Sequence, residues 1–76
     1  MPSLDQLQVG QRGRIESVHG GDALLQRLLE MGLFEGEEVE VVGFAPLGDP
    51  MELRLCDYRL SLRRNKAARI RVTLLA

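Results

Sequence analysis

Few side chains in this sequence of 76 residues could do chemistry. The single histidine, His19, and the single cysteine, Cys56, lie far apart in the chain, so they would form a nucleophile–base pair only if the fold brought them together. His19 and the nearby Asp22 are candidate ligands for a divalent ion such as Fe2+ or Zn2+. Because no His/Cys pair stands at ligand spacing, we expect weak binding at most and no required cofactor. The other interpretation, an exposed His19 without a ligand role, stays open.

The residue patterns of common enzymes are missing. Gly20-Gly21-Asp22 and Leu47-Gly48-Asp49 lack the Lys-Ser/Thr pair of a phosphate-binding loop and are typical of turns. A pI of about 5.7 argues against nucleic-acid binding. Two Phe, one Tyr and no Trp also leave few side chains on which bases could stack. We therefore expect a protein that is not an enzyme and does not bind nucleic acid.

Composition favours one small domain over residues 1–76. The sequence is 45% hydrophobic and 28% charged, which is typical of a globular protein. Its single cysteine cannot form an internal disulfide, and no apolar window is long enough to cross a bilayer. The N-terminus also lacks a basic stretch followed by an apolar run. We expect a cytoplasmic protein that is not embedded in a membrane.

Charge is divided unevenly along the chain. Residues 1–52 carry three basic and ten acidic side chains, whereas residues 53–76 carry seven basic side chains and one acidic. Two interpretations stay open. The two halves pair across strands when the chain folds, or the basic side chains of the second half face an acidic partner.

The first part of the chain predicts a short helix, a strand and a longer helix. Ser3-Leu4-Asp5-Gln6 fits a capping box at the start of a helix that ends by Gly10. Residues 11–19 favour a strand with a bulge or bend. The main helix is predicted over residues 23–31, with Asp22 as its N-cap and Gly32 closing its end.

The main helix carries more apolar residues than a single contact needs. At 100° per residue, Leu24, Leu28 and Met31 form one stripe, and Leu25 with Leu29 forms a second stripe beside it. Leu33 and Phe34 continue the apolar run. We expect part of this surface to seal the core and part to dock on another protein. The alternative, in which all of these residues are core, stays open.

Beyond Gly36 the pattern changes to short strands. Alternation predicts strands over residues 38–44, 51–55, 58–62 and 68–74, with a turn at 46–50. A two-residue loop at Cys56-Asp57 sets three pairs opposite one another: Leu55 with Tyr58, Leu53 with Leu60, and Met51 with Leu62. The elements together predict a mainly β protein, a small antiparallel barrel of about five strands with a short N-terminal helix and one inserted helix after the first strand.

Several blocks of the sequence match a known pattern. They are Arg27-Leu28-Leu29-Glu30-Met31-Gly32-Leu33, Val39-Glu40-Val41-Val42, Ala45-Pro46-Leu47-Gly48-Asp49-Pro50, Leu60-Ser61-Leu62-Arg63 and Ile70-Arg71-Val72. With these blocks the sequence resembles the FeoA family, ferrous-iron transport protein A. The resemblance implies an SH3-like barrel and an accessory role in bacterial ferrous-iron uptake. That role would be exerted by contact with FeoB, a membrane permease with a cytosolic GTPase domain.

The same resemblance also leaves an alternative function. FeoA-like domains resemble the SH3-like domain of metal-dependent repressors, which implies a metal-responsive regulatory module that binds a divalent transition metal. For the favoured function we expect an apolar docking surface and an adjoining loop stiffened by proline. The expected partner-binding residues are Leu25, Leu29, Leu33, Phe34, Pro46, Leu47, Gly48 and Asp49. A stable 46–50 turn without any contact is the alternative for the loop, and a homodimer is an alternative assembly.

Overall fold

The computed structural model describes residues 2–75, which form one antiparallel sheet with short helical segments. In chain order the elements are η1 (Leu4–Gln6), β1 (Arg12–Val18), α1 (Asp22–Glu30), β2 (Glu38–Phe44), β3 (Met51–Leu55), β4 (Tyr58–Leu62), α2 (Arg64–Ala67) and β5 (Ile70–Leu75). The strand order is β4-β3-β2-β1-β5. The mainly β fold expected from the sequence, with a helix inserted after the first strand, is confirmed.

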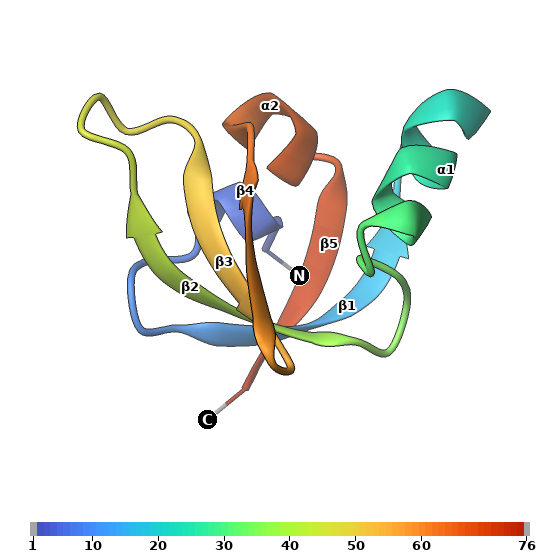
Figure 1. The fold of residues 1–76 in the computed structure, drawn as a ribbon. Coiled ribbons are helices and arrows are strands. Elements are labelled where there is room, and N and C mark those ends of the chain that lie inside the picture. Colours follow the sequence, from blue (N-terminus) through green and yellow to red (C-terminus); the bar gives the residue numbers. More distant parts are fainter. Residues whose placement is uncertain (1, 76) are drawn as a thin grey trace.

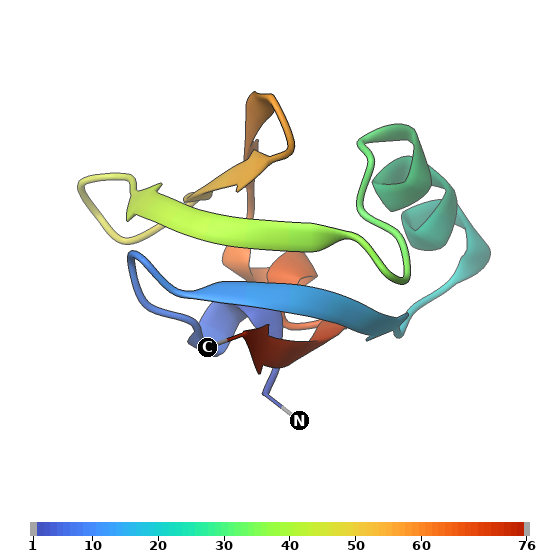
Figure 2. The same cartoon turned by 90° about the horizontal axis from the view of Figure 1, so that it is seen from below.

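The sheet is strongly curved and forms a small half-open barrel. Figure 1 shows α2 above the curved sheet, between β4 and β5, and α1 to one side. Register shifts in β1 between Ile15 and Ser17 and in β2 between Val41 and Gly43 bend these strands, as β-bulges do. The bulge expected in the first strand is therefore confirmed. Seen from below, β1 and β2 run side by side across the molecule (Figure 2).

Alternation along each strand places one set of side chains in the core. In β3, Met51, Leu53 and Leu55 are buried, whereas Glu52 and Arg54 are exposed. Among residues 2–75, fourteen buried apolar residues form the core: Leu4, Leu7, Ile15, Leu28, Leu33, Val39, Val41, Met51, Leu53, Leu55, Leu62, Ala67, Ile70 and Val72. Every strand and all three helical segments contribute residues to it, so the described chain has a single hydrophobic core.

The β3–β4 hairpin has the register predicted from the sequence. Leu55 pairs with Tyr58, Leu53 with Leu60 and Met51 with Leu62. The two-residue loop requires a left-handed backbone, which glycine or asparagine usually supplies. Here Cys56 takes that role with a φ of 48°.

Two element boundaries and the exposure of one side chain differ from those expected. The N-terminal helix is a single 3-10 turn that ends at Gln6, because Leu7 is already extended; the Gln6 side chain still accepts the Ser3 backbone N–H at 3.0 Å. The last strand begins at Ile70, since Ala68 caps the end of α2. Leu74, which strand alternation predicts to share the inward face of Ile70 and Val72, is 48% exposed.

Candidate docking surface

Helix α1 packs only one of its two apolar stripes into the core. Leu28 is fully buried, and Leu24 and Met31 pack against the core from the edge of the same stripe. Leu25 and Leu29 remain 39% and 47% exposed. The division between a core stripe and an exposed stripe is therefore confirmed.

The N-terminal boundary of α1 corrects one expectation. The N-cap is Gly21, with an extended backbone at φ −74° and ψ 167°, and Asp22 is the first helical residue. A carboxylate in the first turn still stabilises the helix, because it faces the positive end of the helix dipole. Asp22 therefore supports the helix from inside the first turn rather than by capping it.

The exposed stripe lines a groove of about 400 Å³. Its walls come from three segments of the chain: the end of β1, helix α1 and the loop that follows the helix. The lining residues are Val18, Leu25, Leu29, Phe34 and Glu35. Phe34 is 39% exposed, so three large apolar side chains show their surfaces in one place. Three of the predicted docking residues therefore lie together.

Leu33 does not belong to this surface, which corrects the sequence prediction. It is fully buried in the core. The reason is the backbone turn at Gly32, where a φ of +90° reverses the chain and lets the Leu33 N–H donate to the carbonyl of Leu28 at 2.8 Å. The turn directs Leu33 inward, while the next residue, Phe34, is left on the groove.

The loop of residues 46–50 lies at the other end of the molecule from α1. Figures 1 and 2 both show the β2–β3 connection on the side opposite the helix. The separation follows from β2, because seven extended residues span roughly 20 Å. The predicted docking residues Pro46, Leu47, Gly48 and Asp49 therefore do not adjoin the groove, and a contact through the loop would be a separate one.

The loop is nevertheless well ordered by hydrogen bonds. Gly48 N–H donates to the carbonyl of Ala45 at 2.7 Å, and Ala45 N–H donates to the carbonyl of Pro50 at 3.0 Å. Leu47 at its tip is 98% exposed. The loop thus holds one apolar side chain out in solvent.

Arg64, which sequence reasoning did not single out, fastens this loop to the rest of the fold. Its backbone N–H donates to Asp49 Oδ1 at 2.8 Å, and its guanidinium donates to the carbonyls of Gly48 at 3.4 Å and Asp5 at 3.1 Å. The guanidinium also lies 5.2 Å from the ring centroid of Phe44. In the sequence, Arg64 is recognisable only as a basic residue at the start of a short helical segment, which does not predict its contacts with the loop.

The two candidate metal ligands lie on the exposed surface. His19 Nε2 is 3.1 Å from the hydroxyl of Ser17, and Asp22 is exposed on α1. Within residues 2–75, His, Cys, Asp and Glu side chains do not gather in groups of three that would hold a metal ion. His19 and Asp22 are therefore at most a two-residue donor set from the described part of the chain.

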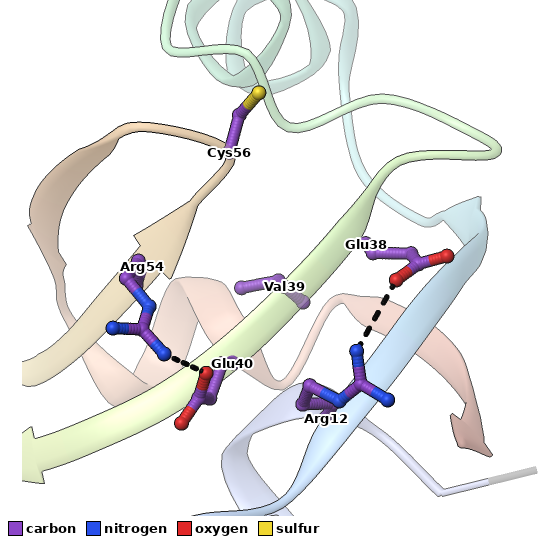
Figure 3. A pocket seen from close by; sticks show the side chains of 6 residues that line it. All are labelled: Arg12, Glu38, Val39, Glu40, Arg54 and Cys56. Carbon is purple, nitrogen blue, oxygen red and sulfur yellow. Dashed lines mark hydrogen bonds and ion pairs between the residues drawn. The ribbon is translucent and has the colours of Figure 1, made fainter. Parts of the chain in front are cut away.

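A second depression, of about 160 Å³, lies on the charged outer face of β1, β2 and β3. Figure 3 shows its two ion pairs: Arg12 lies 3.6 Å from Glu38, and Arg54 contacts Glu40. Val39 and Cys56 complete the lining. Because both carboxylates face guanidinium groups, the charges that line this depression are paired within the fold.

Part of the uneven charge is balanced within the fold. The Arg54–Glu40 pair and the Arg63–Asp49 pair, at 3.6 Å, each join the basic half of the chain to the acidic half. These contacts agree with the cross-strand interpretation for those residues. Arg59, Arg69 and Arg71 are exposed without an ion pair in the described structure.

The described helices are short. None of them between residues 2 and 75 has the length and apolar character needed to cross a membrane.

Comparison with known proteins identifies the domain family of the chain. The family model of the FeoA domain matches residues 3–74. A curated relative from Porphyromonas gingivalis, an Fe(2+) transport protein A/Fe(2+) transporter FeoB fusion protein, is 42% identical over 73 residues, which is 96% of this chain. The chain spans only 9% of that relative's length.

Solved structures agree with the family model. The FeoA protein of Chlorobium tepidum is 40% identical and superposes with a TM-score of 0.89 over 97% of this chain and 70% of its own. FeoA of Stenotrophomonas maltophilia, a prokaryotic SH3 domain protein solved with zinc, is 34% identical, with a TM-score of 0.80 over 96% of this chain and 91% of its own. The expected SH3-like barrel is thus confirmed, and the chain belongs to the FeoA domain family.

Proposed function

We propose that this chain is a non-enzymatic accessory protein of bacterial ferrous-iron uptake. It acts in the cytoplasm by contact with a FeoB-type permease, on the cytosolic part that includes the GTPase domain. The observation that carries the proposal is the apolar groove formed by Val18, Leu25, Leu29 and Phe34, which the fold itself leaves open. Large apolar side chains gathered in one hollow are typical of protein contacts.

The fused relative supports the choice of partner. In that protein, FeoA and FeoB parts belong to one polypeptide, which keeps them at high local concentration relative to each other. Direct contact between the two parts also requires a complementary surface on the FeoA domain. The groove is the described surface best suited to that task, because its apolar side chains lose contact with water when a partner covers them.

The experiment compares leucines that are exposed to the same degree. Leu29→Asp places a charge in the groove, where Leu29 is 47% exposed, and Leu74→Asp is its control on β5, where Leu74 is 48% exposed. Each variant replaces the gene for the wild-type chain in the source bacterium, and ferrous-iron uptake is measured. We expect Leu29→Asp to lower uptake about tenfold and Leu74→Asp to leave it within about twofold.

Two further measurements make the result decisive. Circular dichroism and thermal unfolding establish that both variants fold, and capture of the permease's cytosolic part by the purified chain reports the contact directly. Normal uptake and normal capture with a folded Leu29→Asp variant would overturn the proposal. Leu47→Asp is measured in parallel, because it tests a separate contact through the 46–50 loop.

The second candidate is a metal-responsive module that binds a divalent transition metal. It draws support from the zinc complex of the Stenotrophomonas relative and from the closeness of His19 and Asp22 in the sequence. The support is weaker than for docking, since zinc sites normally use three or four protein ligands.

A further inference from the structure

We infer that the occupant of the groove is a short protein segment that carries large apolar side chains flanked by Lys or Arg. This inference rests on the proposed docking function and adds the chemistry of the partner. Its basis is the position of two carboxylates, Asp22 and Glu35, relative to the apolar lining.

Helix geometry places Asp22 on the same face of α1 as the groove. Successive residues turn by about 100°, so Asp22, seven residues before Leu29, points within about 20° of it. Arg27, two residues before Leu29, points about 160° away from it by the same geometry. The Asp22 carboxylate therefore borders the exposed stripe, and Arg27 lies on the opposite side of the helix.

Glu35 supplies the second carboxylate, directly from the groove lining. It is exposed, and neither Glu35 nor Asp22 forms an ion pair with any residue of the described chain. Between residues 18 and 37 the sequence contains four acidic side chains, one arginine (Arg27), no lysine and one histidine (His19). The side of the groove formed by α1 and the following loop is thus negative, whereas Arg69 and Arg71 lie beyond the Val18 side, at the start of β5. A cationic flank on the partner gains from the two carboxylates of the α1 side.

Other occupants fit this charge pattern less well. Two copies docked groove to groove would bring Asp22 and Glu35 of one copy against the same carboxylates of the other, which is repulsive. A second copy that inserted its exposed Leu47 loop would form a head-to-tail contact, which yields open chains of molecules unless it closes into a ring. The negative rim also disfavours an anionic membrane surface. A cationic apolar segment of another protein satisfies both features of the groove.

The probes are synthetic peptides of about 15 residues that tile the cytosolic part of the FeoB-type protein from the same genome. Fluorescence anisotropy measures their binding to the purified chain at about 50 mM and about 300 mM NaCl. We expect the bound peptides to contain at least two large apolar residues next to Lys or Arg. Their affinity should fall about three- to tenfold at the higher salt concentration.

Charge variants test the two carboxylates. Glu35→Gln and Asp22→Asn should each lower the affinity for the bound peptides about two- to fivefold, and Glu35→Lys should lower it further. Glu52→Gln is the matched control, because Glu52 is an exposed glutamate on β3 whose carboxylate accepts only the Ser61 hydroxyl at 3.2 Å in the described structure. It should leave binding unchanged.

The outcomes separate this inference from the proposed function. If Leu29→Asp abolishes capture of the whole cytosolic part but no peptide binds, or the bound peptides are neutral or acidic, docking stands and this inference fails. Peptide binding that is insensitive to salt and to Glu35→Lys also overturns it. If the chain self-associates with rising concentration and Leu29→Asp abolishes this, the occupant is a second copy of the chain and the inference is overturned.

Discussion

The hydroxyl of Tyr58 occupies the space where a side chain at residue 32 would begin. A Cβ built on Gly32 would lie 2.0 Å from that oxygen, and Gly32 already has a φ of +90°. The same hydroxyl donates to the carbonyl of Met31 at 2.6 Å. The β3–β4 hairpin therefore fastens the C-terminal end of α1, and with it the chain segment that carries Phe34 to the groove.

A double-mutant cycle on these two positions should be strongly non-additive. Tyr58→Phe removes one hydrogen bond and should lower the free energy of unfolding by about 0.5–1.5 kcal/mol. Gly32→Ala should lower it by about 2 kcal/mol, because the new Cβ displaces the Tyr58 hydroxyl from the Met31 carbonyl and strains a left-handed backbone. In the Tyr58→Phe background Gly32→Ala should be milder, since the clashing oxygen is gone.

Urea unfolding followed by circular dichroism measures all four proteins of this cycle. The strained backbone at residue 32 remains in both backgrounds, so the double variant should still be less stable than Tyr58→Phe alone. Strictly additive losses would contradict the assigned contact between the Tyr58 hydroxyl and residue 32.

Adjacent leucines of α1 should differ sharply in their effect on stability. Leu28 is fully buried, so Leu28→Ala should lower the free energy of unfolding by about 2–4 kcal/mol. Leu29 is 47% exposed, and Leu29→Ala should lower it by less than about 1 kcal/mol. Thermal unfolding of the two variants checks the difference. Equal losses would place both leucines in the core and remove the exposed stripe on which the docking proposal depends.

The helical period placed these two leucines on different stripes of α1. It left open whether the second stripe also belongs to the core, which only the fold decided. The hairpin register was predictable from strand alternation, because inward-facing residues alternate on both sides of Cys56-Asp57. Leu33 was not placed correctly. Its burial depends on the backbone direction after Gly32, which the apolar pattern of a helix does not encode.

Contacts between distant segments explain most of what sequence reasoning missed. The Arg64 guanidinium reaches the carbonyl of Asp5, 59 positions away, and its role becomes visible only when the N-terminal turn and α2 are packed together. The separation between the groove and the 46–50 loop likewise depends on the direction in which β2 crosses the sheet. Local patterns predicted the elements, whereas the neighbours of each element came from the tertiary fold.

The surface position of His19 and Asp22 leads to a prediction about metal binding. The described residues offer at most these two donors in one region, so we expect calorimetric titration with Fe(II) or Zn(II) to show no saturable binding in the low micromolar range. Any weaker binding should disappear in His19→Ala and persist in Cys56→Ser, because Cys56 lies at the β3–β4 turn. Stoichiometric micromolar binding that depends on His19 would favour the metal-responsive function instead.

Arg64 should stabilise the 46–50 loop through several contacts at once. Arg64→Ala removes two guanidinium hydrogen bonds and the stacking on Phe44, and should lower the free energy of unfolding by about 1–2 kcal/mol. Arg64→Lys keeps the charge but lacks the planar fork that reaches both carbonyls, so it should restore less than half of that loss. Arg59→Ala, which changes an exposed arginine on β4, is the control and should stay within about 0.5 kcal/mol of wild type.

Hydrogen exchange shows where the stability is lost. The amide of Gly48, which donates to the carbonyl of Ala45, should exchange faster in Arg64→Ala. The exchange rates of amides in the β1–β5 ladder should change only as much as the loss of global stability requires. If Leu47 also contacts the permease, Arg64→Ala should weaken that contact by freeing the loop, while the Leu29-dependent contact at the opposite end of the molecule stays unchanged. Unchanged Gly48 exchange would contradict the role of Arg64, because the backbone of the loop would then hold its shape without it.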